Sequence, residues 1–193
     1  MPGYVHRDVP YGQNAKSSKN ALYRSADPFL HLWFMALAPH RGRLRTATRS
    51  ARLRVIEQCW SRLRAQAWEQ LCRLAVPRLR LFDREWHPAG RYWAGPECEW
   101  DIVSTSLEED ATMLGECKSL SRGAEEADVD RIVRALTVRP GVPGIGPEGG
   151  RRDYVIFEPV LKAKRRSLPR GVTIVDGRRL FSALVEEVDH DVR

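Results

Sequence analysis

The chain has 193 residues, of which 42% are hydrophobic and 30% are charged. This balance is typical of a folded globular protein and excludes a disordered one. The longest apolar stretch, residues 29–38, is shorter than the roughly 20 residues that a membrane-spanning helix needs. We therefore expect no membrane association, and since the N-terminal residues lack the apolar core of a secretion signal, we expect a cytoplasmic protein.

Positive charge is concentrated in the first half of the chain. Residues 1–93 hold 17 Lys and Arg against 6 Asp and Glu, a net charge of +11, whereas residues 94–193 hold 15 against 19, a net charge of −4. A basic half joined to a carboxylate-bearing half suits a metal-dependent enzyme that acts on a polyanion. The alternative is a basic helix that is simply solvated.

The N-terminal part is predicted to hold two segments. Residues 1–22 mix Gly, Pro, Asn, Ser and Lys without periodicity, which indicates an irregular arm. Residues 23–48 form a helical extension in which Asp27 caps the helix and Pro28 takes its first position. Its apolar residues fall on nearly every side, so this helix is either buried in the fold or packed on a partner that is not part of the chain.

The longest predicted helix covers residues 50–76. Its apolar residues recur at spacings of three and four, which predicts one buried stripe. The stripe consists of Leu53, Ile56, Trp60, Leu63, Ala67, Leu71 and Leu74. Five arginines lie mostly off the stripe and are expected to form a basic surface: Arg52, Arg54, Arg62, Arg64 and Arg73.

Beyond this helix the pattern changes to strands. Residues 78–88 alternate in places and suggest a strand. Residues 98–106 and 112–120 are rich in residues that favour strands, and a short acidic segment joins them. The natural prediction is an antiparallel hairpin.

The C-terminal part alternates helices and strands. Acidic residues open the segment 124–138 and basic residues lie near its end, a polarity that suits a helix. Two strands follow, at 154–161 and 172–177, and a helix at 178–188. This order predicts an α/β fold with a mixed β-sheet flanked by helices.

The four cysteines are Cys59, Cys72, Cys98 and Cys117. They are widely spaced and form no CxxC pair, so neither a zinc site nor a disulfide framework is indicated. We interpret them as small buried residues.

The hairpin carries the residues with the clearest chemical meaning. Residues i and i+2 of a strand share a face, so Glu116 and Lys118 are expected on one face, and Cys117 on the other. Pairing of the strands then places Asp101 opposite Glu116. Two close carboxylates repel each other unless a cation lies between them, and a hard, oxygen-ligated ion such as Mg²⁺ meets that need. With Lys118 beside them, the expected reaction is hydrolysis of a phosphodiester.

The segment from Gly95 to Lys118 resembles the signature of the PD-(D/E)xK, or restriction-endonuclease-like, superfamily. In that signature an Asp opens one strand and an ExK tripeptide lies on the next, which here correspond to Asp101, Glu116 and Lys118. The resemblance implies a restriction-endonuclease-like domain over residues 49–193 and a Mg²⁺- or Mn²⁺-dependent nuclease that acts on DNA. Asp101 and Glu116 would be its metal ligands.

A second resemblance extends along nearly the whole chain, to the uncharacterised C-terminal domain of P-loop ATPases of the "archaeal ATPase" group. In those proteins a P-loop domain and a winged helix come first. Here residues 3–12 resemble the tail of a winged helix, and the motif GxxxxGK[ST] does not occur. The likeness implies a P-loop ATPase as a partner, and an alternative function as an inactive module that binds DNA or that partner. The segments that carry it are 23–41, 66–74, 99–103, 115–118 and 172–181.

The superfamily resemblance adds one more candidate. A Glu on the first core helix often joins the metal site, and Glu69 is the matching residue. On the predicted helix, however, Glu69 lies nearly opposite the centre of the apolar stripe, which fits a solvated side chain equally well.

Overall fold

The computed structural model describes residues 4–14, 16, 19–95, 98–147, 149–163 and 168–185. The chain divides into two compact units. The first consists of residues 1–9 and 14–67, and the second of residues 10–13 and 68–193. The division falls inside the long helix α3 (Arg49–Ala75). Among the described residues, no helix combines the length and apolarity required to cross a membrane.

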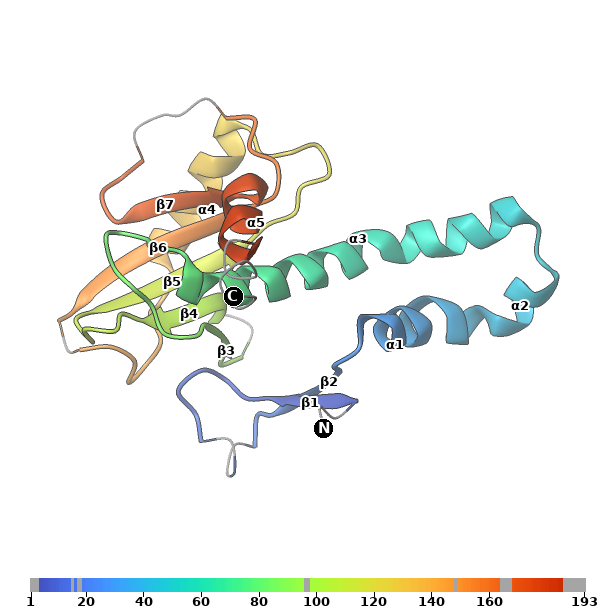
Figure 1. Cartoon of the computed structure of the whole chain (residues 1–193), viewed down its shortest axis with the longest axis horizontal. Helices are drawn as coiled ribbons and strands as arrows, with labels where there is room; N and C mark the ends of the chain where they lie inside the picture. The colour runs from blue at the N-terminus through green and yellow to red at the C-terminus, as the bar shows by residue number, and fades with distance from the viewer. Residues whose placement is uncertain are drawn as a thin grey trace, which may run out of the picture. The chain divides into compact units, whose positions relative to one another are not determined.

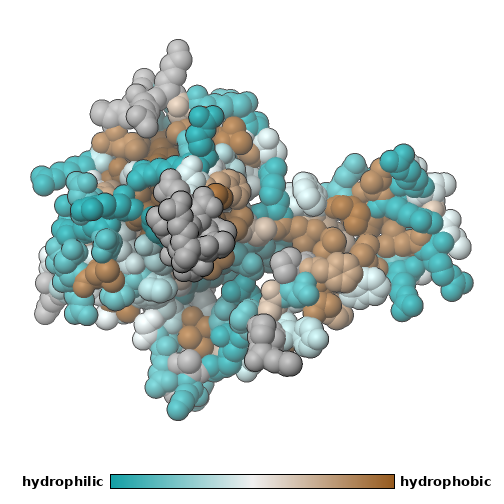
Figure 2. Space-filling view, in the orientation of Figure 1, coloured by the Kyte–Doolittle hydropathy of each residue, from teal (hydrophilic) through white to brown (hydrophobic). Residues whose placement is uncertain are grey.

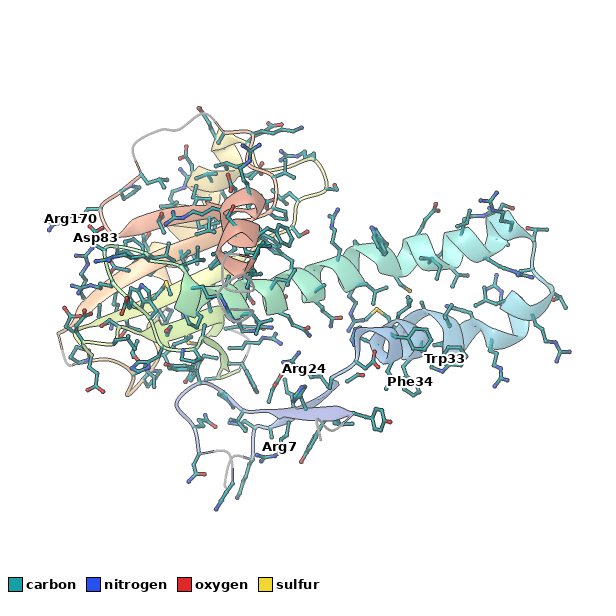
Figure 3. The ribbon with its side chains drawn as sticks, in the orientation of Figure 1. Arg7, Arg24, Trp33, Phe34, Asp83 and Arg170 are labelled. Carbon is teal, nitrogen blue, oxygen red and sulfur yellow. The ribbon has the colours of Figure 1, made fainter. Side chains whose placement is uncertain are left out.

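The N-terminal arm contains a small hairpin. Strands β1 (Val5–Asp8) and β2 (Leu22–Ser25) pair antiparallel, and Arg24 of β2 forms an ion pair with Asp8 of β1. Figure 3 shows Arg24 among the side chains of this hairpin. The strands have exposed residues on both faces. A strand without a buried face has no alternation of apolar residues, which is why the sequence pattern indicated an irregular arm.

The predicted helical extension is present but is segmented. Helix α1 (Pro28–Leu32) begins after Asp27, whose Oδ1 accepts a hydrogen bond of 2.7 Å from the Phe29 N–H, as predicted for the cap. A π-helical turn (Trp33–Leu37), a 3₁₀ turn (Ala38–His40) and α2 (Arg41–Thr46) follow.

The apolar residues of this extension are covered unevenly, since Ala36 is buried and two phenylalanines are exposed. Phe29 is 60% exposed and Phe34 is 65% exposed. The face shown in Figure 2 has apolar side chains at the surface over the helices of the first unit. The first unit by itself therefore does not bury the segment on all sides, and packing on a partner stays a prediction.

Helix α3 is confirmed within one residue at each end, but its predicted stripe is wrong. Leu53, Trp60 and Leu74 are exposed. The residues that the helix buries are instead Val55, Trp68, Cys72 and Ala75. The two small side chains let the end of α3 approach the sheet closely, and Trp68 fills the remaining space. Regular spacing alone did not identify that face.

The second unit is built on a five-stranded mixed sheet in the order β3-β4-β5-β6-β7 (Figure 1). The pairs β3–β4 and β4–β5 are antiparallel, and the pairs β5–β6 and β6–β7 are parallel. The predicted hairpin is confirmed as β4 and β5, with Ile102 paired to Gly115 and Thr105 to Thr112. The strands are β3 (Gly90–Trp93), β4 (Glu99–Thr105), β5 (Ala111–Cys117), β6 (Arg151–Glu158) and β7 (Val172–Asp176).

The strand predicted at residues 78–88 is not present. This segment makes only isolated bridges, and Phe82 and Asp83 have positive φ angles of 58° and 59° that turn the chain sharply. Its alternation arises because Leu79, Leu81 and Trp86 are buried as parts of a loop. Buried loop residues thus mimic the pattern of a strand.

Helices cover both faces of the sheet. Val129, Ile132 and Leu136 of α4 (Glu126–Val138) pack on one face together with Leu114 and Ile156. The end of α3 and helix α5 (Gly177–Val185) pack on the other face. Figure 1 shows α4 and α5 on opposite sides of the strands. The predicted mixed α/β fold is confirmed; residues 164–167 and 186–188 of the predicted loop and last helix lie outside the described residues.

Candidate functional site

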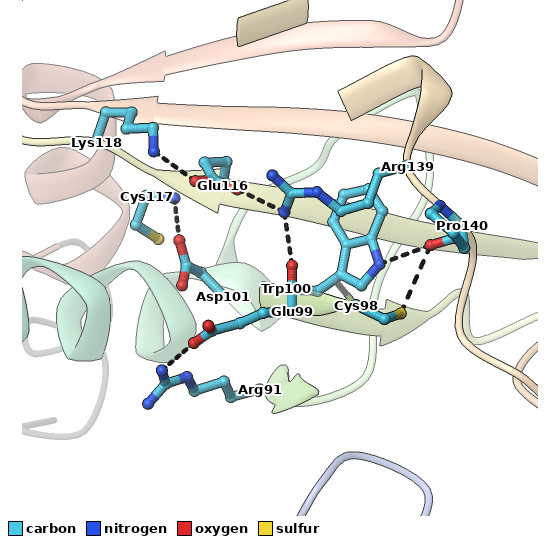
Figure 4. Close-up of polar contacts among 10 residues, drawn as sticks. All are labelled: Arg91, Cys98, Glu99, Trp100, Asp101, Glu116, Cys117, Lys118, Arg139 and Pro140. Carbon is cyan, nitrogen blue, oxygen red and sulfur yellow. Dashed lines mark hydrogen bonds and ion pairs between the residues drawn. The ribbon is translucent and has the colours of Figure 1, made fainter. Parts of the chain in front are cut away.

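The four residues singled out by sequence line one pocket. Because β4 and β5 form a hairpin, the start of β4 and the end of β5 meet at its open end, opposite the turn. A pocket of about 450 Å³ lies there (Figure 4). Its lining residues are Glu69, Arg91, Glu99, Asp101, Glu116, Cys117, Lys118 and Arg139.

Asp101 lies at an irregularity of the sheet. On β3 a single residue, Arg91, separates two residues paired with β4, whereas on β4 both Asp101 and Ile102 lie between their partners. Such a bulge places an extra residue on one strand and redirects its side chain. The Asp101 Oδ2 accepts a hydrogen bond of 2.9 Å from the Cys117 N–H, one residue past Glu116. A side chain thus continues the pairing of β4 with β5 where the regular ladder ends.

The Asp101 carboxylate has little compensation for its charge. Burial, followed by the nearby Glu116 and Glu69 carboxylates, raises its pKa from 3.8 to about 6, although the Cys117 N–H and Arg91 act in the opposite direction. Within the described chain it forms no ion pair. A buried carboxylate beside two others is an environment that a cation would stabilise.

Glu116 is held between two cations. The Lys118 Nζ donates to its Oε1 at 2.5 Å, as expected for residues i and i+2 on one strand face, and Arg139 Nη1 donates to its Oε2 at 2.8 Å. The Glu116 side chain is 13% exposed. Both carboxylate oxygens are therefore neutralised from within the protein.

Glu69 reaches the pocket from α3. Its carboxylate lies 3.7 Å from Arg73 one turn later, and Arg73 Nη1 also donates to the Asp101 carbonyl oxygen at 3.1 Å. Glu69 neighbours Trp68 and Cys72, which are the residues that α3 buries, so it lies at the edge of the covered face and not opposite it. Arg73 is only 16% exposed and is not part of the expected basic surface.

Sequence reasoning missed the two pocket arginines. Arg91 forms an ion pair with Glu99; burial would lower the pKa of Arg91, but Glu99, Glu69 and Asp101 together raise it above its ordinary value. Arg139 follows α4 directly, and its guanidinium lies 4.7 Å from the centre of the Trp100 ring. Their place in the fold depends on long-range packing, and no local motif marks either one.

The cysteines are only partly as expected. Cys72 is buried, whereas Cys59, Cys98 and Cys117 are half-buried, and all four are free thiols. Cys117 points away from Glu116 and packs on the core beneath α3, as predicted. Burial, and then contact with Cys72, raises the pKa of the Cys117 thiol, which is therefore a packing residue.

The pocket has the donors of a hard-cation site without a preassembled set of ligands. Glu69, Asp101 and Glu116 supply carboxylate oxygens, which Mg²⁺ and Mn²⁺ favour. Across the described part of the chain, however, no three His, Cys, Asp or Glu side chains converge as they would around a bound metal. The donor chemistry fits the ion, and Glu116 is engaged by Lys118 and Arg139.

Comparison with known proteins identifies a family. The family model DUF234, described as archaea bacterial proteins of unknown function, matches residues 33–132. The match covers just over half of the 193 residues and includes Glu69, Asp101, Glu116 and Lys118. No curated protein and no solved structure matches the chain. The chain belongs to the DUF234 family of archaeal and bacterial proteins.

Proposed function

We propose that the protein is a Mg²⁺- or Mn²⁺-dependent nuclease that hydrolyses phosphodiester bonds of DNA. The observation that carries this proposal is the meeting of Asp101, Glu116 and Lys118 in one pocket, where the Asp101 carboxylate lacks a compensating charge. The resemblance to the PD-(D/E)xK superfamily supports it. A hairpin followed by parallel strands, with helices on both faces, is compatible with a restriction-endonuclease-like core.

Asp101 and Glu116 would hold the ion, with Glu69 beside them. A bound Mg²⁺ or Mn²⁺ supplies Lewis acidity and makes a bound water more acidic. Lys118 shares the face of Glu116, and its ammonium group would orient the attacking water or stabilise negative charge as it develops on the phosphate. Trp100 and Cys117 pack on opposite faces of the sheet and keep the two strands in place.

A polyanionic substrate is consistent with the charge of the chain. Arg54 and Arg62 are exposed on α3, and exposed arginines bind the phosphate backbone without regard to sequence. The resemblance to the C-terminal domain of the "archaeal ATPase" group adds a P-loop ATPase as a proposed partner.

One observation favours a second candidate, a nuclease-like module without activity. Both oxygens of Glu116 already accept hydrogen bonds from cations, so the protein neutralises this carboxylate without a metal. Such a module would bind DNA or the ATPase.

A cleavage assay separates the two. Purified protein is incubated with labelled single- and double-stranded DNA in Mg²⁺, Mn²⁺ or EDTA, beside Lys118→Ala and Asp101→Asn variants. We expect cleavage only with a divalent ion. Lys118→Ala should abolish cleavage and keep ion binding, because the ligands are carboxylates, whereas Asp101→Asn should lose both. A wild type that binds DNA but cuts nothing in either ion would favour the inactive module.

A further inference from the structure

Arg139 connects three parts of the candidate site. Its Nη1 donates to the Glu116 carboxylate at 2.8 Å and to the Glu99 carbonyl oxygen at 2.6 Å, and its guanidinium stacks on Trp100 (Figure 4). Trp100 is fully buried, and its Nε1 donates to the Pro140 carbonyl oxygen at 3.0 Å. The arginine is therefore fixed at the pocket by contacts other than the one to Glu116.

The contact with Glu116 conflicts with ion binding. Lys118 engages one carboxylate oxygen and Arg139 the other, so a divalent ion that coordinates Glu116 must share an oxygen with a cation that repels it. Lys118 directly follows β5 and lines the same pocket, where its Nζ contacts the Glu116 Oε1. Arg139 can release Glu116 and still keep its stacking on Trp100 and its bond to Glu99.

A released Arg139 would present hydrogen-bond donors to an anion. Both of its bonds come from Nη1, and within the described residues Nη2 and Nε donate to no protein group. The side chain is 23% exposed and lines the pocket. A guanidinium matches the oxygens of a phosphodiester, to which it can donate two parallel hydrogen bonds.

The net charge of the pocket also favours a phosphate once a divalent ion is bound. Four carboxylates (Glu69, Glu99, Asp101 and Glu116) and three cations (Arg91, Lys118 and Arg139) line it, so a divalent ion converts a net negative site into a net positive one. Ion binding would therefore favour both the release of Arg139 and the approach of a phosphate.

We propose that Arg139 couples the two ligands: it competes with the divalent ion for Glu116 in the free protein and binds a backbone phosphate of DNA once the ion is in place. The proposal rests on the proposed function. Because coupling between two ligands is reciprocal, DNA must then raise the affinity for the ion by the same factor by which the ion raises the affinity for DNA. Arg139 is the residue through which this factor acts.

Calorimetry of Mn²⁺ binding tests the coupling in wild type and in Arg139→Gln, each with and without a short DNA oligonucleotide whose integrity is checked on a gel. Without DNA, Arg139→Gln should bind Mn²⁺ about 5- to 150-fold more tightly than wild type, the range of ordinary coupling energies. With DNA, wild type should tighten by a similar factor and the variant should not. Arg134→Gln, an exposed change of equal charge on α4, is the control and should behave like wild type.

If Arg139 had only a structural role, Arg139→Gln would lower the affinity for Mn²⁺ and not raise it, because damage to the pocket weakens ion binding. Equal or weaker Mn²⁺ binding by a folded Arg139→Gln protein would overturn the proposal, as would the absence of Mn²⁺ binding in both proteins. Binding by the variant alone would support it. Since the readout is ion affinity, a wild type that shows the coupling but never cuts DNA would refute the nuclease and leave the role of Arg139 intact.

Discussion

Asp101 should make the folded protein less stable as its carboxylate ionises. The pKa of Asp101 is about 6 in the folded state, against an ordinary value of 3.8 that applies to the unfolded chain. Between these two values the folded state keeps a proton that the unfolded state has lost. The stability of the folded state therefore falls as the pH rises from about 4 to 6. Asp101→Asn removes this penalty and can still accept from the Cys117 N–H. We expect the variant to be more stable than wild type at pH 7.5 without divalent ions, by up to about 3 kcal/mol.

Urea unfolding at pH 7.5 and at pH 4, in EDTA, measures this difference. At pH 4 the difference should be less than about 1 kcal/mol, because the wild-type carboxyl is then protonated in the folded state and roughly half ionised in the unfolded state. A variant that is less stable than wild type at pH 7.5 would show that the ionised Asp101 is already compensated.

The sequence alone predicted three residues of the pocket, Asp101, Glu116 and Lys118, because they lie close together in the chain. Glu116 lies near the end of β5 and Lys118 directly follows the strand, and a hairpin with a short turn brings Asp101 to them. The bulge at Asp101, and the cations Arg91 and Arg139, depend on pairing and packing between distant segments. Arg139 in particular reaches Glu116 only because α4 covers the face of the sheet to which Glu116 points.

At the scale of elements, strand β5 requires glycine immediately before Glu116. A Cβ on Gly115 would lie 2.6 Å from the Val155 Cγ1 and 2.9 Å from the Val155 carbonyl oxygen. Gly115→Ala should therefore destabilise the fold by about 1–3 kcal/mol through overpacking. Gly42→Ala is the control: a Cβ there meets nothing within 4 Å, and its position in α2 predicts a gain of up to about 1 kcal/mol. Thermal unfolding followed by circular dichroism compares them, and equal melting temperatures for Gly115→Ala and wild type would contradict the close approach of β5 and β6.

Two tryptophans of α3 test which face of the helix is covered. Trp68 is 5% exposed and its Nε1 donates to the Phe157 carbonyl oxygen at 3.4 Å, whereas Trp60 is 57% exposed. Trp68→Ala should cost about 3–5 kcal/mol, and Trp60→Ala less than about 1 kcal/mol. Urea unfolding measures both changes. The reverse order would restore the stripe that the spacing of apolar residues predicted.

The stripe failed for a physical reason that also misplaced Glu69. Spacing treats every Leu and Trp as a core residue, but α3 approaches the sheet through Cys72 and Ala75, which contribute little to a hydrophobic pattern. Rotating the buried face to these residues moves Glu69 from the far side of the helix to the edge of the pocket. Element type and extent were predictable, and the choice of face was not.

On the scale of the whole molecule, the basic charge of α3 predicts salt-sensitive binding to DNA. Arg54→Gln/Arg62→Gln removes two exposed cations. If each contacts a phosphate, the slope of log affinity against log salt should fall by about two units. Fluorescence anisotropy with a labelled duplex in EDTA, at several salt concentrations, gives the slope. The double variant Arg134→Gln/Arg178→Gln, with both changes at exposed positions of the second unit, controls for net charge, and identical slopes for all three proteins would exclude α3 as the binding surface.

Most of the sheet was predictable because, as in the hairpin, the pattern that marks each strand lies within one short segment of the chain. β4, β5, β6 and β7 are apolar segments bounded by turns, and helices α4 and α5 follow clear patterns. The turn at Phe82 and Asp83 and the exposed hairpin of β1 and β2 follow from contacts that periodicity does not represent.

Mn²⁺ binding to wild type and Asp101→Asn, measured by calorimetry at pH 7.5, tests most directly whether the pocket is an ion-dependent site. We expect Mn²⁺ to bind the wild type and Asp101→Asn to abolish binding, with both proteins folded to the same extent. Undiminished Mn²⁺ binding by Asp101→Asn would contradict an ion site in this pocket. The same holds for a wild type that binds no Mn²⁺ either with DNA or without it.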